Sequence, residues 1–180
     1  MAVTQDRNRR VRPPLDGAAL EQTALSYAGR YATSRVRLCA YLARKLRERG
    51  WGEPGEPPLA ALVERMAALG YVDDRAFAAG RAAALGRRGY GERRVADALR
   101  AAGIEEDDAA AARETAREGA WAAALRFAER RRIGPFAPAE PDPKGRQKAL
   151  AALVRAGHPP RLARRLVAAR PGEIPDADGR

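Results

Sequence analysis

The sequence predicts an all-α protein, with three tandem three-helix repeats that form an elongated, curved array. Apolar residues recur at spacings of three and four along most of the 180-residue chain, and no segment alternates as a β-strand does. The ends of the three expected middle helices align on a Leu-x-x-x-Gly string, which ends at Gly50, Gly103 and Gly157, 53 and 54 residues apart. A unit of this length buries only a small core and gains stability by stacking on its neighbours, which predicts an array.

Loops rich in proline, glycine and charge set the expected domain boundaries. The N-terminal segment has four arginines and almost no apolar residues, so it cannot bury enough surface to fold. The chain also ends on a short polar stretch. We expect a disordered basic tail at 1–17, three-helix repeats at 18–70, 71–118 and 119–170, and a polar tail at 171–180.

Capping residues delimit the helices of the first repeat. The Ser34 hydroxyl can accept a first-turn amide hydrogen, and Gly50 can adopt the left-handed conformation that ends a helix. A Pro/Gly linker at 53–58 precedes the third helix, which is expected to end at Gly70. The apolar stripes of the three helices are Leu20, Ala24, Leu25, Ala28 and Tyr31; Leu38, Leu42 and Leu46; and Leu59, Leu62, Val63, Met66 and Leu69.

Capping and turn residues also delimit the helices of the second and third repeats. Asp73 or Asp74 is expected to cap a helix, and the acids from Glu105 to Asp108 suit the positive end of the next helix dipole. Residues 86–91 indicate an interhelical turn with exposed arginines, because the Lys-Ser/Thr of a phosphate loop is missing. The apolar stripes are Phe77, Ala78, Ala84 and Leu85; Val95, Ala98 and Leu99; Ala109 to Ala116; Trp121, Leu125 and Ala128; Leu150, Leu153 and Val154; and Leu162, Leu166 and Val167, with a proline-rich linker at 135–143.

Composition excludes several classes of protein. The single cysteine, Cys39, and the single histidine, His158, leave no internal disulfide, no usual four-ligand zinc site and no nucleophile–base pair. We therefore expect neither an enzyme nor a cofactor-binding protein, with Cys39 as a packing residue and His158 in a turn. No apolar run approaches the length of a membrane span and no secretory signal is visible, so a cytoplasmic protein is expected.

The formal net charge of +11 indicates an anionic partner, which could be nucleic acid, an acidic protein surface or an anionic membrane surface. For any single arginine, a solvated helix surface in an arginine-biased chain is the alternative interpretation. Nearby rings are few (Tyr41, Trp51 and Tyr90), so stacking of bases along a single strand is not indicated. Basic residues recur beside the middle helix of each repeat, and the candidate contacts are Arg44, Lys45, Arg81, Arg87, Arg88, Arg93, Arg94, Arg100 and Lys148.

One string in the middle of the chain resembles a known family. It runs Leu69-Gly-Tyr-Val-Asp-Asp-Arg-Ala-Phe-Ala78 and resembles the core motif of the RecX family. The likeness extends from about Ala18 to Ala169 and is most specific in the middle. The last repeat departs from the family where His158 replaces an aromatic residue, and this polar ring is expected to loosen that repeat. Further matching positions are Arg81, Gly89, Arg94, Val95, Leu99, Gly103 and Ile104.

The resemblance implies a non-enzymatic regulator of the RecA recombinase, active in DNA repair, recombination and the SOS response. Such proteins lie along the groove of the RecA–DNA filament and stop its extension or promote its disassembly. We therefore expect a monomer that inhibits RecA by binding its filament, with single- or double-stranded DNA as a further candidate partner. The alternative is a direct DNA-binding protein of helix-turn-helix type. In such a protein the arginines would be concentrated on one recognition helix, whereas here the basic residues are spread over the three expected repeats.

Overall fold

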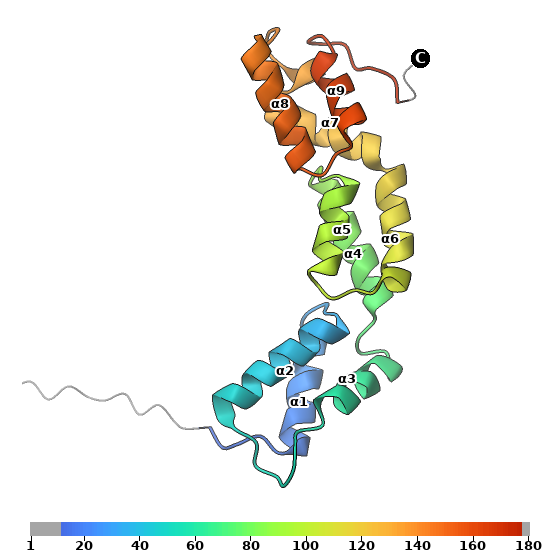
Figure 1. Ribbon diagram of the computed structural model, residues 1–180. Coiled ribbons are helices and arrows are strands. Elements are labelled where there is room, and N and C mark those ends of the chain that lie inside the picture. Colours follow the sequence, from blue (N-terminus) through green and yellow to red (C-terminus); the bar gives the residue numbers. More distant parts are fainter. Residues whose placement is uncertain (1–11, 178–180) are drawn as a thin grey trace, which may run out of the picture. The chain divides into compact units, whose positions relative to one another are not determined.

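The computed structural model describes residues 12–177, and every regular element in that range is helical (Figure 1). The all-α prediction is confirmed. A single parallel β-bridge, between Leu15 and Trp51, is the nearest approach to a strand among these residues. The elements are α1 (Gly17–Ala28), α2 (Arg35–Arg49), α3 (Leu59–Ala68), α4 (Asp74–Arg87), α5 (Glu92–Arg100), α6 (Glu106–Glu118), α7 (Ala120–Arg131), the 3-10 helix η1 (Gly134–Phe136), α8 (Pro143–Arg155) and α9 (Pro160–Ala168).

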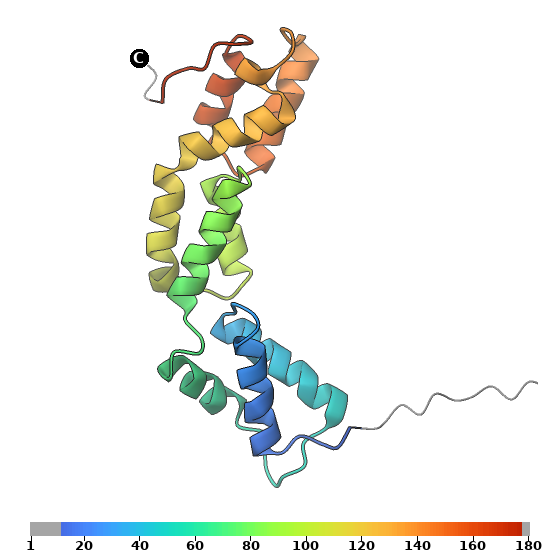
Figure 2. The ribbon, with the colours of Figure 1, turned by 180° about the vertical axis from the view of Figure 1, so that it is seen from behind.

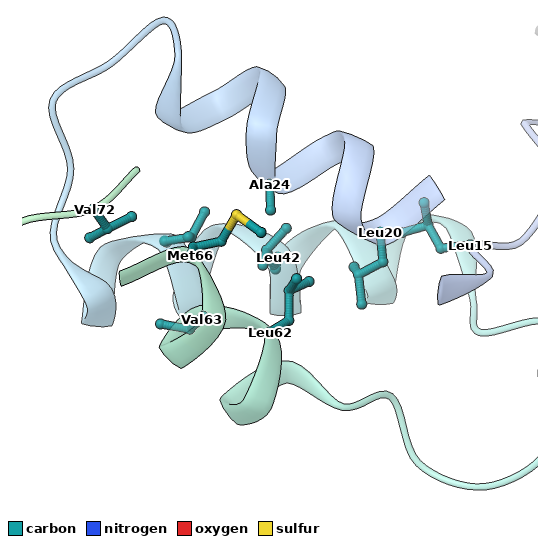
Figure 3. Packing of buried hydrophobic residues seen from close by; sticks show 9 residues of the cluster. Leu15, Leu20, Ala24, Leu42, Leu62, Val63, Met66 and Val72 are labelled. Atoms are coloured by element: carbon teal, nitrogen blue, oxygen red, sulfur yellow. The ribbon is translucent and has the colours of Figure 1, made fainter. Parts of the chain in front are cut away.

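The chain divides into two compact units, with the boundary between Val72 and Asp73. The first unit contains α1 to α3 around one core. Figure 3 shows side chains of all three helices pointing toward one another, among them Leu20 of α1, Leu42 of α2 and Met66 of α3. All three are fully buried. Along each helix the buried apolar residues recur about every four positions, so they lie on one face of that helix and point into the shared core.

The segment before α1 is more ordered than the sequence predicts. Leu15 is fully buried in the first core, its amide donates to Gly50 O at 3.0 Å, and its carbonyl accepts from Gly52 N at 2.9 Å. The Asp16 carboxylate then caps α1 by accepting from Ala19 N at 2.7 Å. The predicted disordered tail is therefore wrong for residues 13–17, because one leucine and one aspartate anchor them. Of the rest of that prediction, residues 1–11 lie outside the described residues and Arg12 is exposed.

The second unit contains two adjoining cores. Helices α4, α5 and α6 surround the first of these, and α7, α8 and α9 with η1 surround the second. Helix α7 packs against α4 and α6 as well as against α8 and α9, which joins the two helix groups (Figure 2). Tyr90, in the turn between α4 and α5, packs against both cores. This turn therefore lies where the two helix groups meet.

Helix ends follow the predicted capping residues. Ser34 accepts from Arg37 N at 3.2 Å at the start of α2, and Asp73 accepts from Ala76 N at 2.9 Å at the start of α4. The three aligned glycines, Gly50, Gly103 and Gly157, all have positive φ, at 83°, 71° and 94°. Glycine adopts this conformation without the steric cost that a Cβ imposes. Each of them follows the end of the second helix in its group.

Candidate binding surface

The arginines of the α4–α5 turn form the densest group of candidate contacts in the second unit. We call Arg87, Arg88, Tyr90, Arg93 and Arg94 the basic turn. The four arginines are exposed and Tyr90 is half-buried. The guanidinium carbons of Arg88 and Arg94 lie 5.6 and 5.9 Å from the centre of the Tyr90 ring. One anchored ring thus positions two cations by cation–π attraction, worth about 0.5–1 kcal/mol each at exposed sites.

Close packing of backbone fixes the course of the basic turn. A Cβ added at Gly89 would lie 2.7 Å from Phe127 N of α7, and one added at Gly91 would lie 2.6 Å from His158 N. Only glycine leaves room for these approaches. Gly91 N also donates to Ala156 O at 2.9 Å, which ties the turn to the end of α8. Gly89 and Gly91 are therefore required by tertiary packing, whereas an added Cβ at Gly86 would meet nothing within 4 Å.

Arg93 has a partner within the protein. Its Nη2 donates to Val154 O at 3.2 Å, and its backbone amide donates to Gly157 O at 3.2 Å. Both acceptors lie at the C-terminal end of α8, where carbonyls lack intrahelical partners. Arg93 thus caps α8 while its side chain stays at the surface. A substitution at Arg93 would disturb the junction between the two helix groups as well as any contact with a partner.

Two arginines of α7 complete the surroundings of the basic turn. Arg126 Nε donates to Gly86 O at 3.2 Å, and Arg130 Nη2 donates to Arg88 O. Both bonds satisfy carbonyls at the C-terminal end of α4, where positive charge also interacts favourably with the helix dipole. These residues are 40 and 42 positions from their acceptors in the sequence. No local sequence pattern signals contacts between residues so far apart, so the sequence does not predict these two hydrogen bonds.

His158 fixes the basic turn from inside the protein. The ring is 3% exposed, its Nε2 lies 3.0 Å from Gly89 O, and it meets Phe127 edge-on with ring centres 5.7 Å apart. Burial lowers the pKa of His158, because the charged imidazolium is disfavoured away from water. The sequence places His158 correctly in a turn. Its polar ring, expected to loosen the third repeat, instead has a hydrogen-bonding partner.

The remaining candidates of the second unit are more dispersed. Arg81 of α4 is exposed and, like Arg87, has no hydrogen-bond or ion-pair partner within residues 12–177. Arg100 pairs with Asp97 at 2.5 Å, so part of its charge is neutralised locally. Lys148 of α8 lies beside a separate pocket of about 250 Å³ that Arg131 and Arg132 also line. The structure therefore groups the turn arginines but leaves Lys148 at a different place.

The first unit presents two of the candidates on α2. Lys45 Nζ lies 2.6 Å from a carboxylate oxygen of Glu48, and Arg44 Nε lies 3.6 Å from the other. The hydrogen bond from Lys45 lowers the pKa of Glu48, since it stabilises the charged carboxylate. Both cations also lie within 6 Å of the Tyr41 ring centre. The two positive charges thus share one negative charge and one aromatic ring.

The described residues offer neither a metal-binding cluster nor a membrane-spanning helix. No cluster of three histidine, cysteine, aspartate or glutamate side chains within residues 12–177 could hold a metal ion. No helix in the same range combines the length and apolar character needed to cross a bilayer.

An alanine-lined groove of about 620 Å³ runs between α4 and α6, bordered by Arg87 and Arg126. What this surface offers chemically is exposed guanidinium groups held on rigid backbone.

Comparison with known proteins identifies the family. No family model matches the chain. The chain is, however, 32% identical over 178 aligned positions to the Regulatory protein RecX of Myxococcus xanthus (strain DK1622), and the alignment covers 92% of this chain and 90% of the relative. The chain belongs to the RecX family. The resemblance carried by the string from Leu69 to Ala78 is therefore confirmed.

The RecX motif has a clear structural role in this chain. Its Asp73 caps α4, and its Val72 and Ala78 are buried, in the cores of the first and second units respectively. Phe77 is half-buried and packs against the core of α4 to α6. The RecX motif thus ends one unit and starts the first helix of the next. Its remaining large hydrophobic side chains, Leu69 and Tyr71, are exposed, at 62% and 52%.

Proposed function

We propose that this RecX-family protein regulates the RecA recombinase by binding the RecA–DNA filament, and that it limits filament extension or promotes disassembly. The observation that carries the proposal is similarity to a Regulatory protein RecX along nearly the whole chain. The net charge of +11 supports it, because a RecA–DNA filament presents many anionic groups. In this proposal the protein acts as a cytoplasmic monomer in DNA repair, recombination and the SOS response, with no catalysis or cofactor of its own.

The proposed contacts centre on the basic turn and on Arg81 and Arg100. Their exposure supports this choice. The contacts of Arg88 and Arg94 with the Tyr90 ring also support it, since preorganised side chains lose less entropy on binding. Arg44, Lys45 and Lys148 would add weaker contacts outside this centre. We also propose that the three helix groups are repeats of one unit. The equivalent positive φ angles at Gly50, Gly103 and Gly157 support that reading, and several weak contacts on one chain would strengthen binding through effective concentration.

A RecA ATPase assay on single-stranded DNA tests the proposal. We expect the protein to lower the steady-state rate at substoichiometric concentrations, because one bound molecule would block growth or cause loss of many RecA protomers. A parallel titration of duplex DNA without RecA, at physiological salt, provides the comparison. An unchanged ATPase rate together with tight, sequence-dependent duplex binding would overturn the proposal and favour a direct DNA-binding protein of helix-turn-helix type.

A further inference from the structure

Three tyrosine rings gather on the first unit, although the sequence separates them. Tyr27 lies at the end of α1, Tyr31 follows that helix, and Tyr41 lies in the middle of α2. The rings of Tyr27 and Tyr41 are stacked, with centroids 3.9 Å apart and planes at 16°. The Tyr31 ring lies 5.3 Å from Tyr27 at 49°. We call these three residues the tyrosine cluster, and it changes the expectation that aromatic residues near the basic residues are sparse.

One ring of the tyrosine cluster is open to solvent. Tyr27 and Tyr41 are half-buried and pack against the core of the first unit, so their stacking serves the fold. Tyr31 is 59% exposed and lies outside that core. Water therefore covers more than half of an aromatic surface that a second flat ring could cover with a gain in free energy. The fold supplies support through ring contacts, because Tyr31 lies against Tyr27 in a tilted arrangement and Tyr27 is stacked on Tyr41.

Positive charge lies beside one ring of the tyrosine cluster and next to another in the sequence. The guanidinium carbon of Arg44 and Nζ of Lys45 lie 5.4 and 5.7 Å from the Tyr41 ring centre. Arg30, adjacent to Tyr31, is exposed. Glu48 is the acid paired with Arg44 and Lys45, and it offsets one of these three charges. An open aromatic face beside excess cations is the combination with which proteins bind single strands of nucleic acid.

We propose that the tyrosine cluster binds an unpaired base of a single-stranded nucleic acid. The base stacks on Tyr31, and Arg30, Arg44 and Lys45 neutralise the flanking phosphates. Stacking tolerates any base because every base has a π-face, so the site is not sequence-specific. Bases within a duplex are already stacked on each other and cannot occupy it. This site goes beyond the proposed contact with RecA, since it requires bases and no second protein.

The test compares two single strands of equal length and charge in a fluorescence-anisotropy titration of the full chain. One is a short oligothymidylate and the other has abasic sugars at every position, so only the first can stack. We expect the protein to bind oligothymidylate about tenfold more tightly, as is typical of one stacked base. Tyr31→Ala should remove most of this difference, whereas Tyr31→Trp should keep it. Tyr71→Ala is the matched control, because Tyr71 is a tyrosine of the first unit that is 52% exposed and lies outside the cluster.

Equal affinity of the unsubstituted protein for the two strands would overturn the proposal, as would an unchanged ratio in Tyr31→Ala. Tighter binding of oligouridylate than of oligothymidylate, with both bound more tightly than the abasic strand, would support the same stacking site and assign it to RNA. RecA inhibition is measured separately on Tyr31→Ala. Loss of the stacking preference with inhibition retained would show that the base site and the RecA contact are independent. Failure of the RecA proposal would leave the binding ratio unaffected.

Discussion

His158 connects two turns of the second unit through one buried hydrogen bond. Because Gly89 O accepts this bond, Nε2 must carry the hydrogen. The other ring nitrogen, Nδ1, is buried and has no hydrogen-bond partner among the described residues. Protonation would place an N–H there with nothing to accept it, and would charge a ring that is 3% exposed. The neutral form is therefore the one that the fold stabilises.

The lowered pKa of His158 predicts that stability falls in mild acid. Above the unfolded value of about 6.5 the ring is neutral in both states, and its contribution does not change with pH. Below 6.5 the unfolded chain takes up a proton before the folded one does, so the free energy of unfolding decreases as the pH drops toward the folded pKa. Urea denaturation between about pH 7.5 and 5.5 should show this decrease at no more than about 1.4 kcal/mol per pH unit.

His158→Gln provides the control, because glutamine can still donate to Gly89 O but does not titrate. His158 is the single histidine of the sequence, so this substitution removes all imidazole titration. The variant should be less pH-dependent over the same range. An identical pH dependence in both proteins would show that His158 is not responsible.

At the scale of elements, the α4–α5 turn and the α8–α9 turn meet by backbone contact. Gly91 N donates to Ala156 O, and Arg93 N donates to Gly157 O. A larger side chain at Gly91 would collide with His158 N and the Gly157 carbonyl, both of which are backbone atoms. Backbone cannot rotate aside as a flexible side chain can. The contact between the two helix groups thus requires a residue without a Cβ at position 91.

Two glycine-to-alanine substitutions in the second unit should have opposite effects on stability. Gly91→Ala should lower the free energy of unfolding by about 1–3 kcal/mol, the usual cost of overpacking. Gly80→Ala should raise it by about 0.8–1 kcal/mol, because Gly80 lies inside α4 with nothing within 4 Å of an added Cβ. Urea denaturation followed by Trp121 fluorescence in a Trp51→Phe background reports on this unit. Destabilisation by Gly80→Ala, or none by Gly91→Ala, would contradict the packing described.

Local sequence rules predict the helices well and the contacts between them poorly. The caps at Ser34 and Asp73 follow from hydroxyl and carboxylate groups placed just before apolar stripes. The anchor at Leu15 was missed because one leucine among charged and proline residues has no periodicity. The contact between Gly91 and Ala156 joins residues 65 positions apart. Only the fold brings such positions together.

At the scale of the whole molecule, positive charge is abundant, but some arginines are bonded to other parts of the protein and others are not. Arg93, Arg126 and Arg130 are bonded to carbonyls of the second unit, whereas Arg81 and Arg87 have no such partner among the described residues. Composition and recurrence could predict that a basic surface exists and roughly where. They could not separate arginines that cap helices from arginines free to bind a partner, because the difference lies in tertiary contacts.

The charge-reversal pair Arg87→Glu with Arg94→Glu tests the central claim, that this RecX-family protein acts on RecA through its basic turn. Neither side chain is bonded to a carbonyl or carboxylate in the described residues, so the fold should persist. Arg161→Glu with Arg164→Glu is the matched control, since both residues are exposed, neither is bonded to a carboxylate or carbonyl among the described residues, and the net charge changes equally outside the proposed contacts.

The deciding measurement is the concentration of each variant that halves the RecA ATPase rate on single-stranded DNA. We predict at least a tenfold increase for the basic-turn variant, because like charges across an interface cost on the order of several kcal/mol, and almost no change for the control. Equal inhibition by the two variants, at the concentrations that suffice for the unsubstituted protein, would contradict the account.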